Sequence, residues 1–428
     1  MNFKLLLASA LVFSASAAGA AEADYSGFVK VSGPDLVKPD GSKLFIMGTN
    51  LGNWLNPEGY MFNFRRTNSP RMINDMFCEL VGPDATAEFW EQFKENYITK
   101  ADIDFIAAQG ANTIRLPFHY KLFTDEDYMG ETANQKGFDY IDKVVSWARN
   151  NGLYVILDMH DAPGGQTGDN IDDSYGYPWL LTSERSQKQF CDIWKEIAKR
   201  YKDETAILGY ELINEPIAHY FEDKDSLNAL LQPLHMRAVS AIREADPNHI
   251  ILLGGPQWNS VFTPLTNWTY DNNLMWTCHR YGGDATAEAI SHYIETRDRS
   301  NLPMYMGEIG HNTDKWQADF ARVMKENNIG YTFWPYKKAG GSCMNGVKMP
   351  EGWDIIVEFS EAPRGTYEEI RNARPSGARL DSVKTAMKTY LENIKAANCE
   401  PQTSYIESML LNEPQPKAKA KTKNGKRK

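Results

Sequence analysis

The chain has 428 residues, 42% of them hydrophobic, and a formal net charge of −10, so it can bury one large core. The last twelve residues, 417–428, hold seven basic groups and no acid, which leaves residues 1–416 with a charge of −17. An acidic body of this kind excludes nucleic acid as the main partner and fits a neutral substrate.

The first twenty residues, 1–20, have the pattern of a signal peptide. One early lysine, Lys4, precedes a short apolar run, and Ala18-Gly-Ala20 fits a cleavage site between small residues. The run is too short to span a membrane, and no second run of about 18 apolar residues follows it. The sequence therefore predicts an exported protein, secreted or periplasmic, with cleavage near Ala20 and no membrane span.

Apolar runs between turn signals predict eight strands, and amphipathic helix patterns lie between most of them. From Phe138 to Ala148, for example, apolar residues recur at helical spacing. Eight alternations of strand and helix predict an α/β fold, a closed (β/α)₈ TIM barrel with functional groups at the carboxyl ends of its strands. The predicted strands are Leu44–Thr49, Thr113–Pro117, Tyr154–Met159, Leu208–Ile213, Ile250–Leu253, Leu274–Cys278, Met304–Gly307 and Tyr331–Trp334.

The loops that follow the strands are unequal in length. The loops at 51–83, 161–182 and 336–379 are long, which is expected on a face that binds a ligand. We find no linker to a second domain, so we expect a single barrel domain over residues 21–400 and a flexible tail over residues 401–428. The basic end of this tail, 417–428, is either a solubilising segment or a binder of anionic surfaces.

Two of the predicted strands end in a glutamate. The run from Ile207 leads to Asn214-Glu215-Pro216, and the run from Leu302 leads to Gly307-Glu308. A carboxylate at the tip of a buried strand is poor for packing, but it stands at the mouth of a barrel where catalytic groups are found. Two such carboxylates acting on one substrate are what glycoside hydrolysis uses.

The chain resembles glycoside hydrolase family 5, a family of (β/α)₈ retaining β-glycosidases, from about Gly48 to Lys337. The resemblance rests on Asn214-Glu-Pro216, on Gly307-Glu308 and on Thr113-Ile-Arg-Leu-Pro117. Within the family, the segment His160-Asp-Ala-Pro-Gly-Gly-Gln166 is similar to a loop of the exo-β-1,3-glucanase branch.

The resemblance implies a role for each matching position. Glu215 would be the general acid/base and Glu308 the nucleophile, with Arg115 and Tyr281 bound to the carboxylate of Glu308. Proximity of the two acids predicts a proton on Glu215 and an ionised Glu308 beside Arg115. The expected substrate contacts of the remaining residues are Asn214 with the sugar 2-hydroxyl, His160 with other hydroxyls, His279 beside the acid/base, and Trp334 under the sugar.

Several other side chains allow two interpretations. Trp54, Trp179 and Trp258 are either sugar platforms or packing residues at the barrel mouth. The loop Asp169–Asp173, with acidic residues at 169, 172 and 173, forms either a solvated loop or hydroxyl-binding rim, or a Ca²⁺ site, and we favour the first. The sequence leaves open whether one disulfide forms among Cys78, Cys343 and Cys399. We expect the other histidines to be structural, namely His119, His219, His235, His249, His292 and His311.

These observations predict a monomeric retaining β-glycoside hydrolase that uses no cofactor and no metal. Its expected substrate is an oligosaccharide or polysaccharide, namely a β-glucan with β-1,3 or β-1,4 linkages. Linkage, endo or exo attack, and water or sugar as the acceptor stay open, so β-mannanase, xyloglucanase and transglycosylase remain alternatives. A more distant alternative is a barrel that binds carbohydrate without catalysis.

Overall fold

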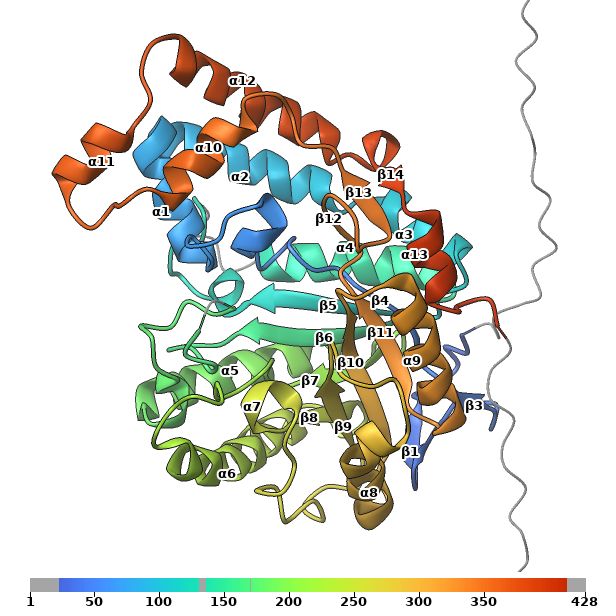
Figure 1. Ribbon diagram of the computed structural model, residues 1–428. Helices are drawn as coiled ribbons and strands as arrows, with labels where there is room; N and C mark the ends of the chain where they lie inside the picture. The colour runs from blue at the N-terminus through green and yellow to red at the C-terminus, as the bar shows by residue number, and fades with distance from the viewer. Residues whose placement is uncertain (1–22, 131–135, 170, 414–428) are drawn as a thin grey trace, which may run out of the picture.

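The computed structural model of the protein describes residues 23–130, 136–169 and 171–413 (Figure 1). The predicted signal peptide, 1–20, and the basic segment, 417–428, lie outside the described residues. Within the described ranges, no helix is both long enough and apolar enough to cross a membrane. All five cysteines are free, so the disulfide left open by the sequence is not formed in this structure.

Eight parallel strands close into a barrel, and each strand hydrogen-bonds to the next along the chain until β11 pairs with β4. This confirms the predicted (β/α)₈ fold. Every residue of the eight strands is buried, as expected for parallel strands covered on both faces. The strands are β4 (Met47–Asn50), β5 (Thr113–His119), β6 (Tyr154–Asp161), β7 (Ile207–Glu211), β8 (Ile250–Gly254), β9 (Leu274–His279), β10 (Met304–Gly310) and β11 (Gly330–Trp334).

Helices surround the barrel and cover its outer face (Figure 1). The α-helices are α1 (Pro70–Val81), α2 (Pro83–Tyr97), α3 (Lys100–Ala108), α4 (Lys136–Asn150), α5 (Glu184–Tyr201), α6 (Lys224–Arg243), α7 (Pro256–Asn259), α8 (Ser291–Ser300), α9 (Asp314–Glu326), α10 (Trp353–Glu361), α11 (Tyr367–Ala373), α12 (Ala378–Asn393) and α13 (Thr403–Ser408). Short 3₁₀ turns are η1 (Gly59–Phe62), η2 (Tyr120–Phe123), η3 (Trp179–Leu181), η4 (Glu288–Ile290) and η5 (Ala396–Asn398).

The first predicted strand is divided in two. β3 (Lys43–Leu44) belongs to a small antiparallel sheet with β1 (Lys30–Ser32) and β2 (Asp35–Val37), whereas β4 belongs to the barrel. Apolar residues of the small sheet pack against the amino-terminal parts of the barrel strands. The small sheet therefore covers one end of the barrel, and the carboxyl end is left as the mouth.

The last loop and the C-terminal residues form a further layer. Helices α10 and α12 lie beside α1 and α2 (Figure 1), and a second small sheet holds β12 (Lys337–Ala339), β13 (Asn345–Val347) and β14 (Glu400–Pro401). The predicted flexible tail is wrong for residues 401–413. Helix α13 packs against α9, the Tyr405 hydroxyl donates to the Trp334 carbonyl at 3.2 Å, and Met409 is fully buried.

One buried lysine joins this layer to the barrel. The Lys337 ammonium lies 2.6 Å from the Asp102 carboxylate and donates to the carbonyls of Tyr97 and Ile394 at 2.7 and 2.8 Å. The side chains of Lys337 and Asp102 are fully buried. All three N–H groups of the ammonium are therefore used inside the protein, and Lys337 is a structural residue.

We expect Lys337→Met to lower the free energy of unfolding by about 3–5 kcal/mol, because it leaves the Asp102 carboxylate buried without its cation. Denaturation by urea measures the change. Lys395→Met is the control, since Lys395 forms an exposed pair with Glu392 and its loss costs less than about 1 kcal/mol. Equal effects of the two substitutions would contradict this account of Lys337.

Candidate active site

Arg115 lies at the centre of the barrel mouth. It is on β5, it is fully buried, and each of its five N–H groups has an acceptor. Its Nε and Nη2 bind both oxygens of Glu211 at 2.9 and 2.8 Å, and its Nη1 binds Glu308 Oε1 at 2.6 Å. It also donates to Asn50 and Asn214 and pairs with Asp158. A guanidinium is suited to this task because it holds carboxylates in a fixed fork geometry.

Glu308 stands at a β-bulge in β10. The pairing registers with β9 and β11 both shift at this point, and bulges commonly re-aim side chains beside active sites. Gly307 precedes it, and a Cβ there would lie 2.6 Å from Thr277 Oγ1, so only glycine fits. The second oxygen of Glu308 accepts the Tyr281 hydroxyl at 2.5 Å. Both carboxylate oxygens are thereby fixed.

Glu215 follows β7 on an irregular backbone. Its φ is 44°, and that of Ile217 is 60°, in the left-handed region that costs ordinary residues roughly 1–2 kcal/mol each. Strain of this kind persists where the surrounding structure imposes it, and it clusters at functional sites. The carboxylate of Glu215 lies 2.7 Å from His279 Nδ1. The left-handed turn therefore brings Glu215 to the same mouth as Glu308.

The two glutamates face one another across a short gap. Carboxylate oxygens of Glu215 and Glu308 lie within 4.8 Å of each other, and His279 Nδ1 lies between them. Retaining glycosidases separate their carboxyl groups by about 5–5.5 Å, whereas inverting enzymes need roughly 6.5–9.5 Å. The geometry therefore has room for attack by one carboxylate and leaves no room for a water between them.

The environments of the two glutamates push their pKa values apart. Burial raises the pKa of Glu215, and the nearby Glu308 carboxylate adds to this shift. Burial also acts on Glu308, but the charges of His279 and Arg115 outweigh it and lower the pKa of Glu308. Opposite shifts in one site assign the proton to Glu215 and the charge to Glu308.

The floor of the mouth is aromatic. The rings of His160 and Trp334 are stacked, with centroids 5.1 Å apart and an interplanar angle of 3°. His160 Nδ1 binds Asp158 at 2.7 Å, and Trp334 Nε1 donates to the Tyr60 hydroxyl at 2.6 Å. These hydrogen bonds orient both rings, and Trp334 lines the cavity although it is only 3% exposed.

A cavity of about 330 Å³ opens above these residues, at the small end of the usual range for ligand sites. It has walls from three loops as well as from strand tips. Five of the predicted site residues line it, together with four residues that the strand-tip argument missed. The lining residues are Glu58, Tyr60, His160, Ile171, Glu215, Tyr281, Glu308, His311 and Trp334.

Among the missed residues, Glu58 is a third carboxyl in the cavity. Burial raises its pKa to about 8, so it is protonated at neutral pH and offers both a donor and an acceptor. The sequence predicted a purely structural role for His311. The structure corrects this, because His311 lines the cavity and its Nε2 lies 3.1 Å from the Tyr60 hydroxyl. Glu58 and Tyr60 come from the long first loop, where no periodic pattern marked them.

Glu211 was also missed, and Asp158 stood among the polar residues at the strand tips without a predicted role, although both sit on barrel strands. Both are fully buried partners of Arg115. The signal was present, since Glu211 interrupts the apolar run four residues before Glu215, and Asp158 precedes His160 by two residues on the same face.

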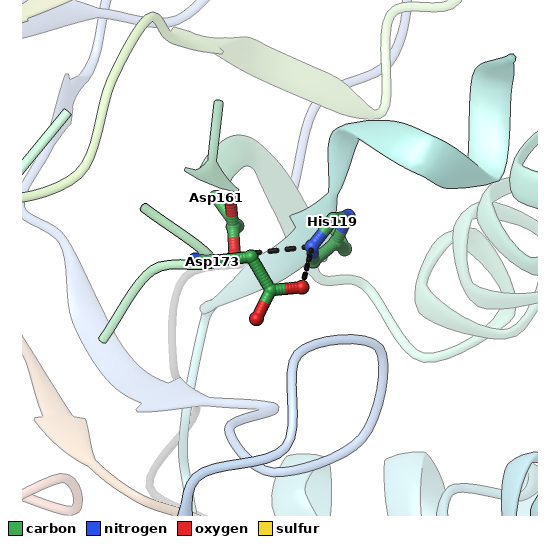
Figure 2. Close-up of side chains that lie close together, drawn as sticks. All are labelled: His119, Asp161 and Asp173. Atoms are coloured by element: carbon green, nitrogen blue, oxygen red, sulfur yellow. Dashed lines mark hydrogen bonds and ion pairs between the residues drawn. The ribbon is translucent and has the colours of Figure 1, made fainter. Parts of the chain in front are cut away.

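A second carboxylate and histidine cluster lies near the mouth (Figure 2). His119 Nε2 is 3.0 Å from Asp161 and 3.1 Å from Asp173. The Lys121 backbone N–H donates to His119 Nδ1 at 3.1 Å, which uses the lone pair of that nitrogen. A neutral imidazole has one such lone pair, so Nε2 carries the proton and donates to the carboxylates. The donor set does not fit a metal ion.

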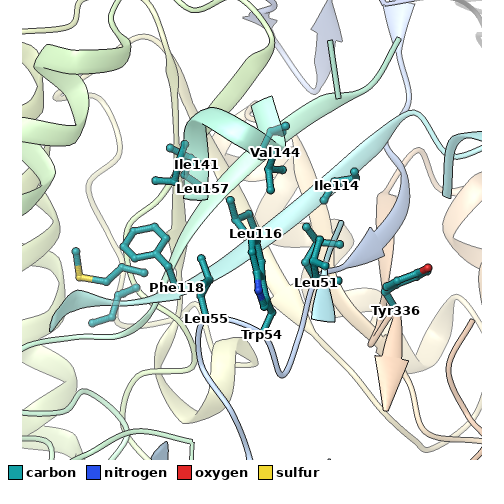
Figure 3. Close-up of a cluster of buried hydrophobic side chains, with 14 of the residues drawn as sticks. Leu51, Trp54, Leu55, Ile114, Leu116, Phe118, Ile141, Val144, Leu157 and Tyr336 are labelled. Atoms are coloured by element: carbon teal, nitrogen blue, oxygen red, sulfur yellow. The ribbon is translucent and has the colours of Figure 1, made fainter. Parts of the chain in front are cut away.

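The three tryptophans proposed as platforms differ in exposure. Trp54 is only 1% exposed, donates to the Lys94 carbonyl at 2.7 Å and packs among apolar side chains of β5 and α4 (Figure 3). Of the two interpretations of Trp54, the sugar platform is therefore wrong and packing is right, because its ring is covered. Trp179 is 45% exposed and Trp258 is half-buried, so both rings are accessible, although neither lines the cavity.

Comparison with known proteins identifies the family. The model of the family described as Cellulase (glycosyl hydrolase family 5) matches residues 69–340, more than half of the chain. The chain belongs to glycoside hydrolase family 5. As a member of this family it is a glycoside hydrolase, and the barrel and the paired glutamates are those expected of the resemblance.

Curated relatives of this chain carry different names. A β-xylosidase of Phanerodontia chrysosporium is 28% identical over 73% of this chain and 71% of its own length. Endoglucanase C of Acetivibrio thermocellus is 26% identical over 63% of this chain and 92% of its own. Glucan 1,3-beta-glucosidase I/II of Saccharomyces cerevisiae is 30% identical over 44% of this chain and 45% of its own length.

The opposite pKa shifts predict a bell-shaped dependence of kcat/KM on pH. Rising pH removes the proton of Glu215, whose pKa is raised, so the alkaline limb lies above the ordinary glutamate value of 4.5. Falling pH protonates Glu308, whose pKa is lowered, so the acidic limb lies below that value. The profile of Glu215→Gln is the control and should lack the alkaline limb. An alkaline limb that persists unchanged in this variant would contradict the assignment.

Proposed function

We propose that the protein hydrolyses β-1,3- or β-1,4-linked glucans with retention of configuration, using Glu308 as nucleophile and Glu215 as acid/base. The observation that carries the proposal is the pair of carboxylates within 4.8 Å, one beside Arg115 and the other beside His279. The names of the curated endoglucanase and glucan 1,3-beta-glucosidase relatives support the choice of glucan.

The reaction has two displacements. Glu308 attacks the anomeric carbon while Glu215 gives its proton to the leaving oxygen, and a glycosyl ester forms on Glu308. Glu215, now ionised, takes a proton from water, and the water attacks the same carbon from the side that the leaving group vacated. The ester breaks, Glu308 is freed as a carboxylate, and the proton is back on Glu215.

The neighbouring residues support these steps. Arg115 and Tyr281 hold both oxygens of Glu308 and keep it ionised for attack. Burial lowers the pKa of His279, but the surrounding carboxylates outweigh it and raise the pKa to about 10, so His279 keeps a proton that it donates to the Glu215 carboxylate left after proton transfer. Asn214 binds the sugar 2-hydroxyl, His160 binds further hydroxyls, and Trp334 lies beneath the ring.

The outer parts of the proposal concern substrate binding and location. The accessible rings of Trp179 and Trp258 serve as platforms for sugars beyond the cavity. The amino-terminal pattern at 1–20 supports export to the periplasm or the medium, where polysaccharides are found. We propose that the exported chain acts as a monomer.

We expect Glu308→Ala and Glu215→Ala each to lower kcat on an aryl β-glucoside by at least about 10³-fold with an unchanged fold. Azide separates the two roles because it needs no general base to attack. Added azide should restore turnover of Glu215→Ala as β-glucosyl azide, with retained configuration. With Glu308→Ala, azide should give the α-glucosyl azide. Full activity of either variant, or the opposite pairing of products, would contradict the assignment.

A panel of purified polymers tests the substrate class. Release of sugars from β-1,3- or β-1,4-glucan, with little release from mannan, xyloglucan or xylan, is the expected result. Preference for one of the last three polymers would overturn the glucan proposal and leave the two-glutamate mechanism intact. Oligosaccharides longer than the substrate would identify a transglycosylase.

A further inference from the structure

The loop after β6, described at residues 162–169 and 171–174, is joined to the backbone that carries Glu215. The Gln166 side-chain amide donates to the Asn214 carbonyl at 2.9 Å, and the Thr167 hydroxyl donates to the Glu215 carbonyl at 2.7 Å. In return, the N–H groups of Ile217 and Ala218 donate to the carbonyls of the same two loop residues, at 2.9 and 3.0 Å. Gln166 and Thr167 are fully buried.

These four hydrogen bonds surround the strained part of the chain. The positive φ angles at Glu215 and Ile217 are ones that these residue types adopt only under external constraint. Ile217 is β-branched, so the left-handed conformation is especially unfavourable for it. Because each strained residue has a loop hydrogen bond on its own carbonyl or N–H, the loop is in the right place to impose the conformation.

The loop is itself held by the cluster of Figure 2. Asp161 and Asp173 lie at its two ends, and the Asp173 N–H donates to the Asp161 carboxylate at 2.7 Å. His119, on β5, donates to both carboxylates, and the Arg71 N–H donates to Asp173 at 2.8 Å. Inside the loop, the Asp172 carboxylate accepts the Thr167 and Gly168 N–H groups. The loop is therefore anchored to the barrel at both ends.

We propose that residues 162–169 and 171–174 form a clamp that positions the acid/base Glu215, with Thr167 and Gln166 as positioning residues and His119 as the remote anchor. The proposal rests on the role of Glu215 proposed above. The clamp acts through the backbone, because its hydrogen bonds are to carbonyl and N–H groups and none is to the Glu215 carboxylate. Loosening the clamp should misplace the acid while the nucleophile, held by Arg115 and Tyr281, stays in position.

Leaving-group dependence separates misplacement of the acid from general damage. A series of aryl β-glucosides runs from 2,4-dinitrophenyl, which leaves without protonation, to phenyl, which needs a proton. The ratio kcat/KM reports the first displacement, in which Glu215 acts as acid. We expect Thr167→Val to lower kcat/KM for the phenyl glucoside by about tenfold or more, a fraction of the contribution of a general acid. The value for the dinitrophenyl glucoside should fall less than about threefold.

Two matched variants control this test. Thr167→Ser keeps the hydroxyl and should keep the wild-type dependence on the leaving group. Thr205→Val makes the same substitution at another hydroxyl that donates to a carbonyl, that of Tyr25, far from the cavity, and should leave the dependence unchanged. A fall in kcat/KM for Thr167→Val that is equal across the series, or no fall at all, would overturn the clamp.

Glu215→Ala, measured on the same series, distinguishes failure of the clamp from failure of the proposed function. A steep leaving-group dependence in this variant with a flat one in Thr167→Val would contradict the clamp and leave the acid/base role of Glu215 intact. A flat dependence in both variants would contradict the acid/base role of Glu215.

His119→Asn tests the remote anchor. The asparagine oxygen can still accept the Lys121 N–H, but the donor to the two aspartates is lost. A lower melting temperature is expected, together with a steeper leaving-group dependence than the wild type. A folded His119→Asn protein with the wild-type dependence would remove His119 from the proposal. If this variant does not fold, the leaving-group dependence of Thr167→Val tests the clamp.

Discussion

The barrel mouth depends on one buried cation. Arg115 is surrounded by Asp158, Glu211 and Glu308, three carboxylates that could not share a buried space without it. The same guanidinium fixes one oxygen of Glu308 and keeps that residue ionised. In the proposed mechanism, structural and catalytic demands thus fall on one side chain, because the group that makes the acidic mouth stable also prepares Glu308, the proposed nucleophile. An exposed arginine would do neither, since water would screen its charge.

Around this centre, regular barrel geometry is broken at both places where the chain delivers an acid. Glu308 follows a register shift in β10, and Glu215 lies in a left-handed turn after β7. A third irregular segment, Gln257–Asn259, lies in the short element α7, whose backbone has positive φ at these residues and is not a regular α-helix. Its Gln257 N–H donates to the Ile217 carbonyl. The eight-stranded scaffold is rigid, so these local departures aim two side chains at one point without loosening the core.

The sequence predicted the strands and the two glutamates because buried parallel strands leave a simple pattern, an apolar run that ends in a polar group. It did not predict Glu58, Tyr60 or His311, since long loops have no period and their side chains reach the cavity only through the fold. Trp54 was left between two roles because an aromatic residue after a strand has the same sequence pattern whether it faces the cavity or the core. Residues 401–413 were taken as a tail because a short helix with few apolar residues gives little signal before its docking surface is known.

The central claim is that Glu308 attacks the sugar while Arg115 and Tyr281 hold its carboxylate. A 2-deoxy-2-fluoro-β-glucoside with a dinitrophenyl leaving group slows the second displacement, so the covalent intermediate accumulates. Mass spectrometry of the digested protein should then find one added fluoroglucosyl group on the peptide that contains Glu308. Labelling of Glu215 or Glu58 in its place would contradict the account, as would turnover with inverted configuration and no labelled peptide.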